Sequence, residues 1–125
     1  MTRKTFIAEY TRILTLAMKL ADKSLQQGTA SLKNEIEDIG DEIFKQGLRL
    51  AADGTEPRLI DEIMTNRTAH EKDKHARLLK TVQKRAVLGI QAKEPLYVFY
   101  HVLLSIPGLT AMEEKQIEKL VLLRD

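Results

Sequence analysis

Hydrophobic residues recur at spacings of three and four along most of the chain, which is the pattern of helices that bury one face. The first such stripe runs from residue 6 to residue 21, and Gly28 lies just beyond it. A glycine in that place supplies the left-handed conformation that ends many helices. The pattern predicts a first helix that ends at Gly28 and a short second helix, capped by Thr29 or Ser31, that continues to about Ile36.

A third apolar stripe covers residues 43–51 and stops at Asp53-Gly54. Gly47 lies inside this stripe and has no side chain to bury. It either weakens the helix by about 1 kcal/mol relative to alanine or allows another backbone to come close.

The next predicted helix begins after Gly54, with Thr55 as its cap and Pro57 in its first turn. Its opening turns and its later turns, up to Ala86, carry apolar residues, but Thr65 to Arg77 contains only two alanines as apolar positions. A run of about 13 residues without an apolar face cannot pack against a core. We therefore predict one long helix whose polar middle projects into solvent or meets a polar partner.

The last part of the chain predicts two more helices. Residues 96–104 are apolar on nearly all sides, which suits a buried helix begun at Pro95, although residues 97–100 would also fit a strand. We favour the helix because nothing else in the chain alternates with period two. Pro107-Gly108 indicates a turn, and Thr110 to Glu113 reads as a capping box. The last helix carries the apolar residues Ile117, Leu120, Val121 and Leu123.

The expected fold class is therefore all-α, a single helical bundle of about five to six helices in one domain, residues 1–125. A chain of this length forms one ordinary domain. The sequence has no cysteine, which excludes disulfides and thiolate chemistry. No secretory signal is recognisable, and the longest uncharged stretch, residues 95–112, is shorter than the roughly 20 residues of a membrane span. We expect a cytoplasmic protein without a membrane span.

Catalytic and metal chemistry find little support in the sequence. His70 and His75 are five residues apart, whereas two zinc-binding histidines on one helix face are four apart. His101 lies in an apolar run and has no recognisable nucleophile beside it. The acidic residues could hold a hard cation but match no calcium loop, so a solvated face is expected. We predict that the protein is not an enzyme and needs no cofactor. Catalysis through His101 and these carboxylates ranks third, after protein binding and nucleic-acid binding. The acidic residues are Glu35, Glu37, Asp38, Asp41 and Glu42.

Positive charge is concentrated in the middle of the chain. Residues 65–93 carry 8 basic and 2 acidic side chains, although the whole chain has a net charge of only +2. On one continuous helix, five of these residues would gather on roughly one side, namely Arg67, Lys74, Arg77, Lys80 and Lys84. Such a surface could be a solvated helix face, a contact for an acidic protein or a nucleic-acid site. No aromatic residue lies between Phe44 and Tyr97, which argues against base stacking.

Two segments resemble the cytoplasmic domain of the MotA family, the ion-driven stator proteins of the bacterial flagellar motor. Leu25 to Leu32 is similar to that family's Gly-x-x-(Ser/Ala)-Leu helix corner. The segment from Phe44 to Ile63 is similar to its Gly-Leu-x-Leu, Asp-Gly-Thr-(Asp/Glu)-Pro and (Ile/Leu)-x-Glu-Ile pattern. The resemblance covers residues 6–83, whereas residues 84–125 form divergent C-terminal helices.

The resemblance implies a helical domain that contacts the rotor of the motor through charged residues. The family's membrane segments are missing from this sequence, and we expect a naturally soluble protein rather than an excised fragment. At two contact positions the chain departs from the family, with Leu25 in place of an arginine and Lys33 in place of a glutamate. Such changes should weaken stator-like docking, because mismatched charges at an interface are costly.

The sequence therefore favours a non-enzymatic, protein-binding or structural protein of the flagellar motor or its regulation. The partner-binding candidates are Leu25, Lys33 and the five basic residues around the polar segment. They would meet an acidic partner or a second copy of the chain. A basic nucleic-acid-binding helical module is the alternative.

Overall fold

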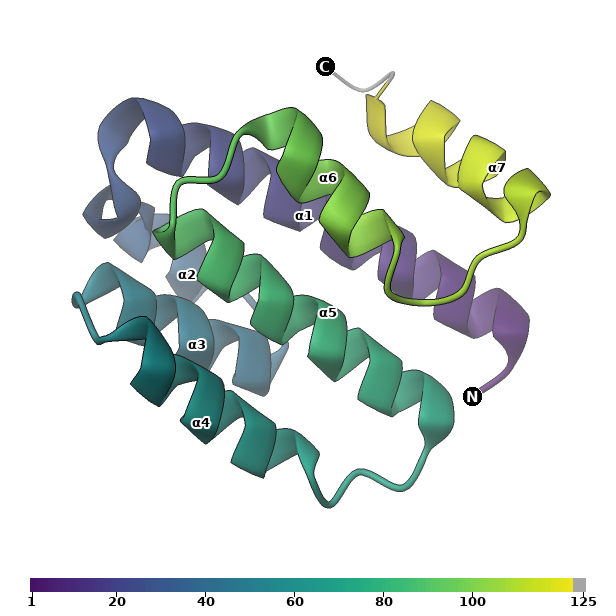
Figure 1. Cartoon of the computed structure of the whole chain (residues 1–125), viewed down its shortest axis with the longest axis horizontal. Coiled ribbons are helices and arrows are strands. Elements are labelled where there is room, and N and C mark those ends of the chain that lie inside the picture. Colours follow the sequence, from purple (N-terminus) through teal and green to yellow (C-terminus); the bar gives the residue numbers. More distant parts are fainter. Residues whose placement is uncertain (123–125) are drawn as a thin grey trace.

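The computed structural model describes residues 1–122, and every regular element in that range is a helix (Figure 1). The predicted all-α class is therefore confirmed. The bounds are α1 Arg3–Gln27, the 3₁₀ helix η1 Thr29–Leu32, α2 Lys33–Glu37, α3 Glu42–Ala52, α4 Pro57–Thr68, α5 Lys74–Gln91, α6 Leu96–Leu104 and α7 Ala111–Leu122. Seven α-helices in this range exceed the predicted five to six. The predicted apolar position Leu123 lies outside the described residues.

The long helices α1 and α5 pack against each other and form the middle of the bundle (Figure 1). Helices α3 and α4 pack against α5, while α6 contacts both α1 and α5, and α7 contacts α1. The buried side chains form one hydrophobic cluster that all these helices share. The periodic stripe of α1 is its largest contribution, with Phe6, Tyr10, Ile13 and Leu14 fully buried.

The predicted helix ends are mostly correct. Gly28 ends α1 with a φ of 89°, and its amide donates to the Ser24 carbonyl at 2.8 Å. Helix α3 ends at Ala52; Asp53 is its C-cap and precedes Gly54, which has a φ of 82°. The short second helix is present as the η1 turn followed by α2. Thr55 is not a cap, because the residue before α4 is Glu56 and no side chain caps this helix.

The predicted long helix from Gly54 to Ala86 is wrong. Helix α4 ends at Thr68, a turn occupies residues 69–73, and α5 runs back beside α4 as the second arm of a hairpin (Figure 1). The Asp73 carboxylate accepts the Ala76 amide at 2.8 Å and caps α5. The polar run therefore marks a turn between two packed helices, and no helix projects into solvent in the described part of the chain.

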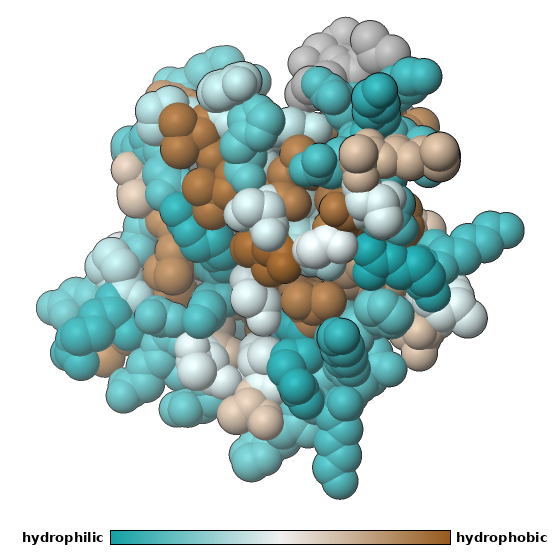
Figure 2. All heavy atoms as spheres, turned by 45° about the vertical axis from the view of Figure 1, so that its right-hand side comes forward, coloured by the Kyte–Doolittle hydropathy of each residue, from teal (hydrophilic) through white to brown (hydrophobic). Residues whose placement is uncertain are grey.

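Helix α6 is a helix, as predicted, but it is buried on only one side. Phe99 and Leu103 are fully buried, whereas Tyr97 is 76% exposed and Val98 is 50% exposed. Figure 2 brings the right-hand side of Figure 1 forward and shows hydrophobic side chains interspersed with hydrophilic ones on that face of the molecule. The expectation of a helix buried on all sides was therefore wrong, because α6 covers the bundle from outside.

Candidate functional site

The hairpin of α4 and α5 distributes the five basic candidates over two helices. Arg67 lies in the last turn of α4, whereas Lys74, Arg77, Lys80 and Lys84 lie on α5. They therefore do not share one face of a continuous helix, as the sequence predicted. The turn at residues 69–73 instead brings positive charge to both arms of a hairpin.

Two of the five cations form ion pairs with carboxylates of the same hairpin. Lys80 Nζ lies 2.7 Å from Glu71 Oε1, and Lys84 Nζ lies 3.0 Å from Asp61 Oδ1. These hydrogen bonds lower the pKa of the Glu71 and Asp61 carboxyl groups. The positive charge of Lys80 and Lys84 is therefore partly neutralised within the protein.

Arg77 is held differently, because its guanidinium meets a carbonyl rather than a carboxylate. Its Nε and Nη2 donate to the Glu71 carbonyl oxygen at 3.0 and 2.6 Å. Arg67 and Lys74 are exposed, and no carboxylate of residues 1–122 lies within 4.0 Å of either charged group. These three side chains keep their full positive charge near the tip of the hairpin.

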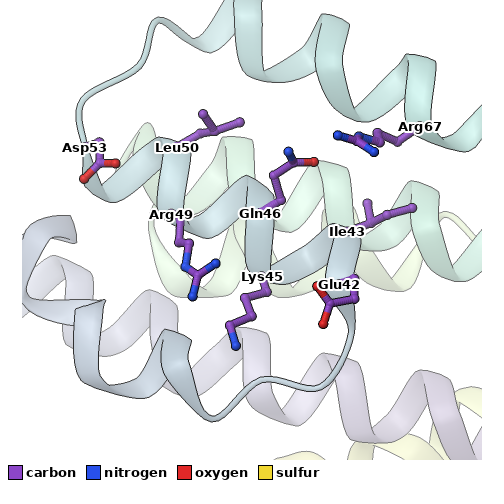
Figure 3. Close-up of a pocket in the computed structure, with 8 residues that line it drawn as sticks. All are labelled: Glu42, Ile43, Lys45, Gln46, Arg49, Leu50, Asp53 and Arg67. Atoms are coloured by element: carbon purple, nitrogen blue, oxygen red, sulfur yellow. The ribbon is translucent and has the colours of Figure 1, made fainter.

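Arg67 of α4 lines a groove of about 410 Å³ on the surface of α3, whose other lining residues all lie on α3 or at its C-cap (Figure 3). Ile43, Gln46 and Leu50 point from α3 toward α4, so the groove has a partly apolar wall. Lys45 and Arg49 of α3 extend to the opposite side of that helix. There Lys45 donates to the Glu37 carbonyl and Arg49 pairs with the Glu37 carboxylate at 3.0 Å.

Leu25 and Lys33 form a second, separate group at the corner between α1 and α2. Leu25 is 39% exposed in the last turn of α1, and Lys33 is the exposed first residue of α2. Lys33 Nζ approaches Asp53 Oδ1 to 3.9 Å, a weak contact between two exposed groups. Figure 1 places this corner at the opposite end of the bundle from the turn between α4 and α5. The structure therefore does not bring all seven candidates together.

The acidic residues that the sequence singled out are mostly paired with cations of neighbouring helices. Glu35 pairs with Lys23, Glu37 with Arg49, and Asp41 with Arg12. In the part of the chain that the structure describes, no three acidic or histidine side chains converge as metal ligands would.

The histidines also occupy separate places. His70 is exposed on the turn between α4 and α5, but His75 is half-buried and stacks on Phe6 with 4.7 Å between ring centres. His75 is thus a packing residue. His101 is exposed on α6 and lies against Tyr97, with 4.5 Å between ring centres.

The sequence reasoning missed the exposed side of α6. The uncharged stretch from Pro95 to Met112 was the sequence signal for an exposed apolar surface, but its composition suits a buried helix equally well. Only the packing of α6 on α1 and α5 shows that Tyr97, Val98 and His101 face outward.

Comparison with known proteins confirms the resemblance to the MotA family. The chain is 32% identical to motility protein A of Treponema phagedenis over 97 residues, which are 77% of this chain and 36% of that protein. It is 32% identical to motility protein A of Borreliella burgdorferi over 77 residues, or 59% of this chain and 30% of that protein. For Treponema pallidum the identity is 29% over 97 residues, or 77% of this chain and 36% of that protein.

The chain thus spans about a third of the length of the curated relatives it matches. No family model matches it, and no solved structure matches it. Among the described residues, no helix combines the length and the hydropathy that crossing a membrane requires.

Proposed function

We propose that this chain is a cytoplasmic, non-enzymatic protein that binds a component of the flagellar motor and acts in the motor or its regulation. The similarity to motility protein A over 77% of the chain is the observation that carries this proposal. The match covers only part of the relatives, so the proposal concerns the helical body that this chain shares with them.

The contact surface that we propose lies at the turn between α4 and α5. Arg67, Lys74 and Arg77 keep their charge there and are exposed. Uncompensated positive charge on a surface attracts an acidic partner and accelerates the encounter with it. A protein partner is favoured over nucleic acid, because no aromatic residue lies on the hairpin for base stacking.

The corner with Leu25 and Lys33 is proposed as a second contact. The resemblance places an arginine and a glutamate of the stators at these two positions, so this corner offers an apolar and a positive side chain in their place. We expect it to bind a stator's rotor partner weakly and to prefer a different, acidic surface.

The experiment is a pull-down of tagged chain from a flagellated host, with the recovered proteins identified by mass spectrometry. We expect a motor component to be recovered by the wild-type chain and lost with the double variant Arg67→Glu and Lys74→Glu. Lys115→Glu is the matched control, because Lys115 is equally exposed on the distant helix α7. Recovery of no motor component would rule out the proposal.

A further inference from the structure

A second groove, between α4 and α5, lies on the hairpin beside the turn. It has a volume of about 510 Å³ and is open to solvent. Its lining consists of short side chains and two long cations, namely Thr65, Thr68, Ala69, Arg77, Thr81 and Lys84. Because the residues along the groove are small, a partner's backbone can approach it closely.

Arg77 and Lys84 place positive charge at two points along this groove. They are seven residues apart on α5, which corresponds to two helical turns and about 10.5 Å along the axis. Thr81 lies between them on the same helix. The groove therefore offers two charged positions at a spacing that a helix reproduces.

The threonine hydroxyls cannot hold an anion by themselves. Thr68 donates its hydroxyl hydrogen to the Met64 carbonyl at 2.8 Å, and Thr81 donates to the Arg77 carbonyl at 2.9 Å. Arg77 uses Nε and Nη2 for the Glu71 carbonyl, and a guanidinium has five N–H donors, so some stay available. An anion in the groove would thus depend on Arg77 and Lys84.

In the free protein, Lys84 already forms an ion pair with Asp61. Lys84 donates to Thr65 Oγ1 at 3.0 Å as well as pairing with Asp61; the Lys84 side chain is 28% exposed and the Asp61 side chain is 52% exposed. Because solvent reaches both side chains, a pair of this kind contributes little free energy, typically about 1 kcal/mol or less. A carboxylate from a partner can therefore replace Asp61 at small cost.

We propose that this groove binds an acidic helix of the partner protein, with two carboxylates seven residues apart that meet Arg77 and Lys84. The inference rests on the proposed function and names the chemistry of the partner. In a partner helix that lies along α5, two residues seven apart are also separated by two turns and about 10.5 Å along the axis. Both carboxylates can therefore meet their cations at the same time. Asp61 then acts as an internal competitor for the second carboxylate.

The test uses the full chain and a synthetic helical peptide with two glutamates seven residues apart, measured by fluorescence anisotropy at low salt. A control peptide carries the two glutamates two residues apart, where they point to different sides of the helix. We expect the first peptide to bind more tightly. Arg77→Gln and Lys84→Gln should each weaken binding about 2- to 5-fold, the range of an exposed ion pair.

The decisive variant is Asp61→Asn, which should strengthen binding of the first peptide about 2- to 5-fold, because it releases Lys84. Lys115→Gln removes the same charge on α7 and should change nothing, and Arg77→Lys should keep most of the binding. Thermal unfolding of each variant shows that it is folded.

The inference is overturned if Lys115→Gln weakens peptide binding as much as Lys84→Gln does, or if Asp61→Asn does not strengthen peptide binding. It is also overturned if a DNA or RNA oligonucleotide of equal charge competes more effectively than the peptide. Failure here leaves the proposed function intact when a motor component is still recovered in the pull-down. Conversely, if the peptide binds but the pull-down recovers no motor component, the proposed function is wrong and the groove still stands as a site for an acidic helix.

Discussion

Two helical glycines lie where a neighbouring side chain leaves no room for a β-carbon. A β-carbon on Gly47 would lie 2.5 Å from the Met64 sulfur, and one on Gly89 would lie 2.5 Å from Glu94 Oε1 and 2.7 Å from the ring of Phe99. The sequence left open whether Gly47 weakened α3 or let another backbone come close, and the structure shows a close side chain, Met64, instead of a backbone. At Gly47 the obstacle is mainly the flexible end of Met64, whereas at Gly89 the buried ring of Phe99 stands beside the Glu94 carboxylate.

We expect Gly89→Ala to destabilise the protein by about 1–2 kcal/mol. Overpacking against Phe99 costs about 1–3 kcal/mol, and the better helix propensity of alanine returns up to about 1 kcal/mol. Urea unfolding measures the difference. Gly40→Ala is the control, since a β-carbon there meets nothing within 4 Å. Equal stability of the Gly89 variant and wild type would show that α5 and α6 are packed less closely than described.

At the scale of the elements, the predicted capping box of α7 is confirmed, whereas the single-residue caps predicted at Thr55 and at Thr29 or Ser31 are wrong. The Glu113 amide donates to Thr110 Oγ1 at 3.1 Å, and the Thr110 amide donates to Glu113 Oε1 at 2.9 Å, as the capping box predicts. The cap at Asp73 carried a comparable signal, but the polar run around it was read as one projecting helix. A run without an apolar face is compatible with a turn or with a solvated helix, and hydrophobic periodicity does not separate the two.

The cap of α7 also ties this helix to α1, because Arg3 makes two hydrogen bonds to the Glu113 carboxylate at 3.0 and 2.9 Å. These bonds lower the pKa of Glu113 to about 2. A carboxyl with a lowered pKa stabilises the fold above its unfolded pKa, near 4.5, and loses that effect as the pH falls toward 2.

We therefore expect wild type to unfold at a higher temperature than Glu113→Gln at pH 6. The difference should shrink steadily between pH 4.5 and pH 2. Glutamine keeps the capping-box geometry, so the comparison isolates the charge. A melting-temperature difference that is independent of pH would contradict the role of Arg3.

For the whole molecule, the contacts between distant parts of the chain decide how α6 is held. The buried Tyr10 hydroxyl of α1 donates to the Leu103 carbonyl at the end of α6 at 2.8 Å. Burial raises the pKa of Tyr10 well above its ordinary value, so the hydroxyl stays protonated as a donor. The Tyr100 hydroxyl on α6 is buried as well, but no group of the described residues accepts its hydrogen bond.

These two tyrosines provide a matched pair of variants. Tyr10→Phe should cost about 1–1.5 kcal/mol, because it removes a buried hydrogen bond. Tyr100→Phe should be neutral or slightly stabilising, since the lost hydroxyl satisfies no partner. Urea unfolding of both variants checks the order. The reverse order would mean that Tyr100, rather than Tyr10, anchors α6 to the bundle.

The sequence by itself determined the all-α class, most helix ends and the resemblance to the MotA family. These features depend on residues close together in the chain, since apolar repeats, caps and terminal glycines act within one or two turns. The tertiary structure alone decided that α4 and α5 fold back on each other, that Lys80 and Lys84 are paired while Arg67 and Lys74 are not, and that one side of α6 is exposed. These outcomes depend on which distant helices meet, and a local pattern of polar and apolar residues contains no information on that.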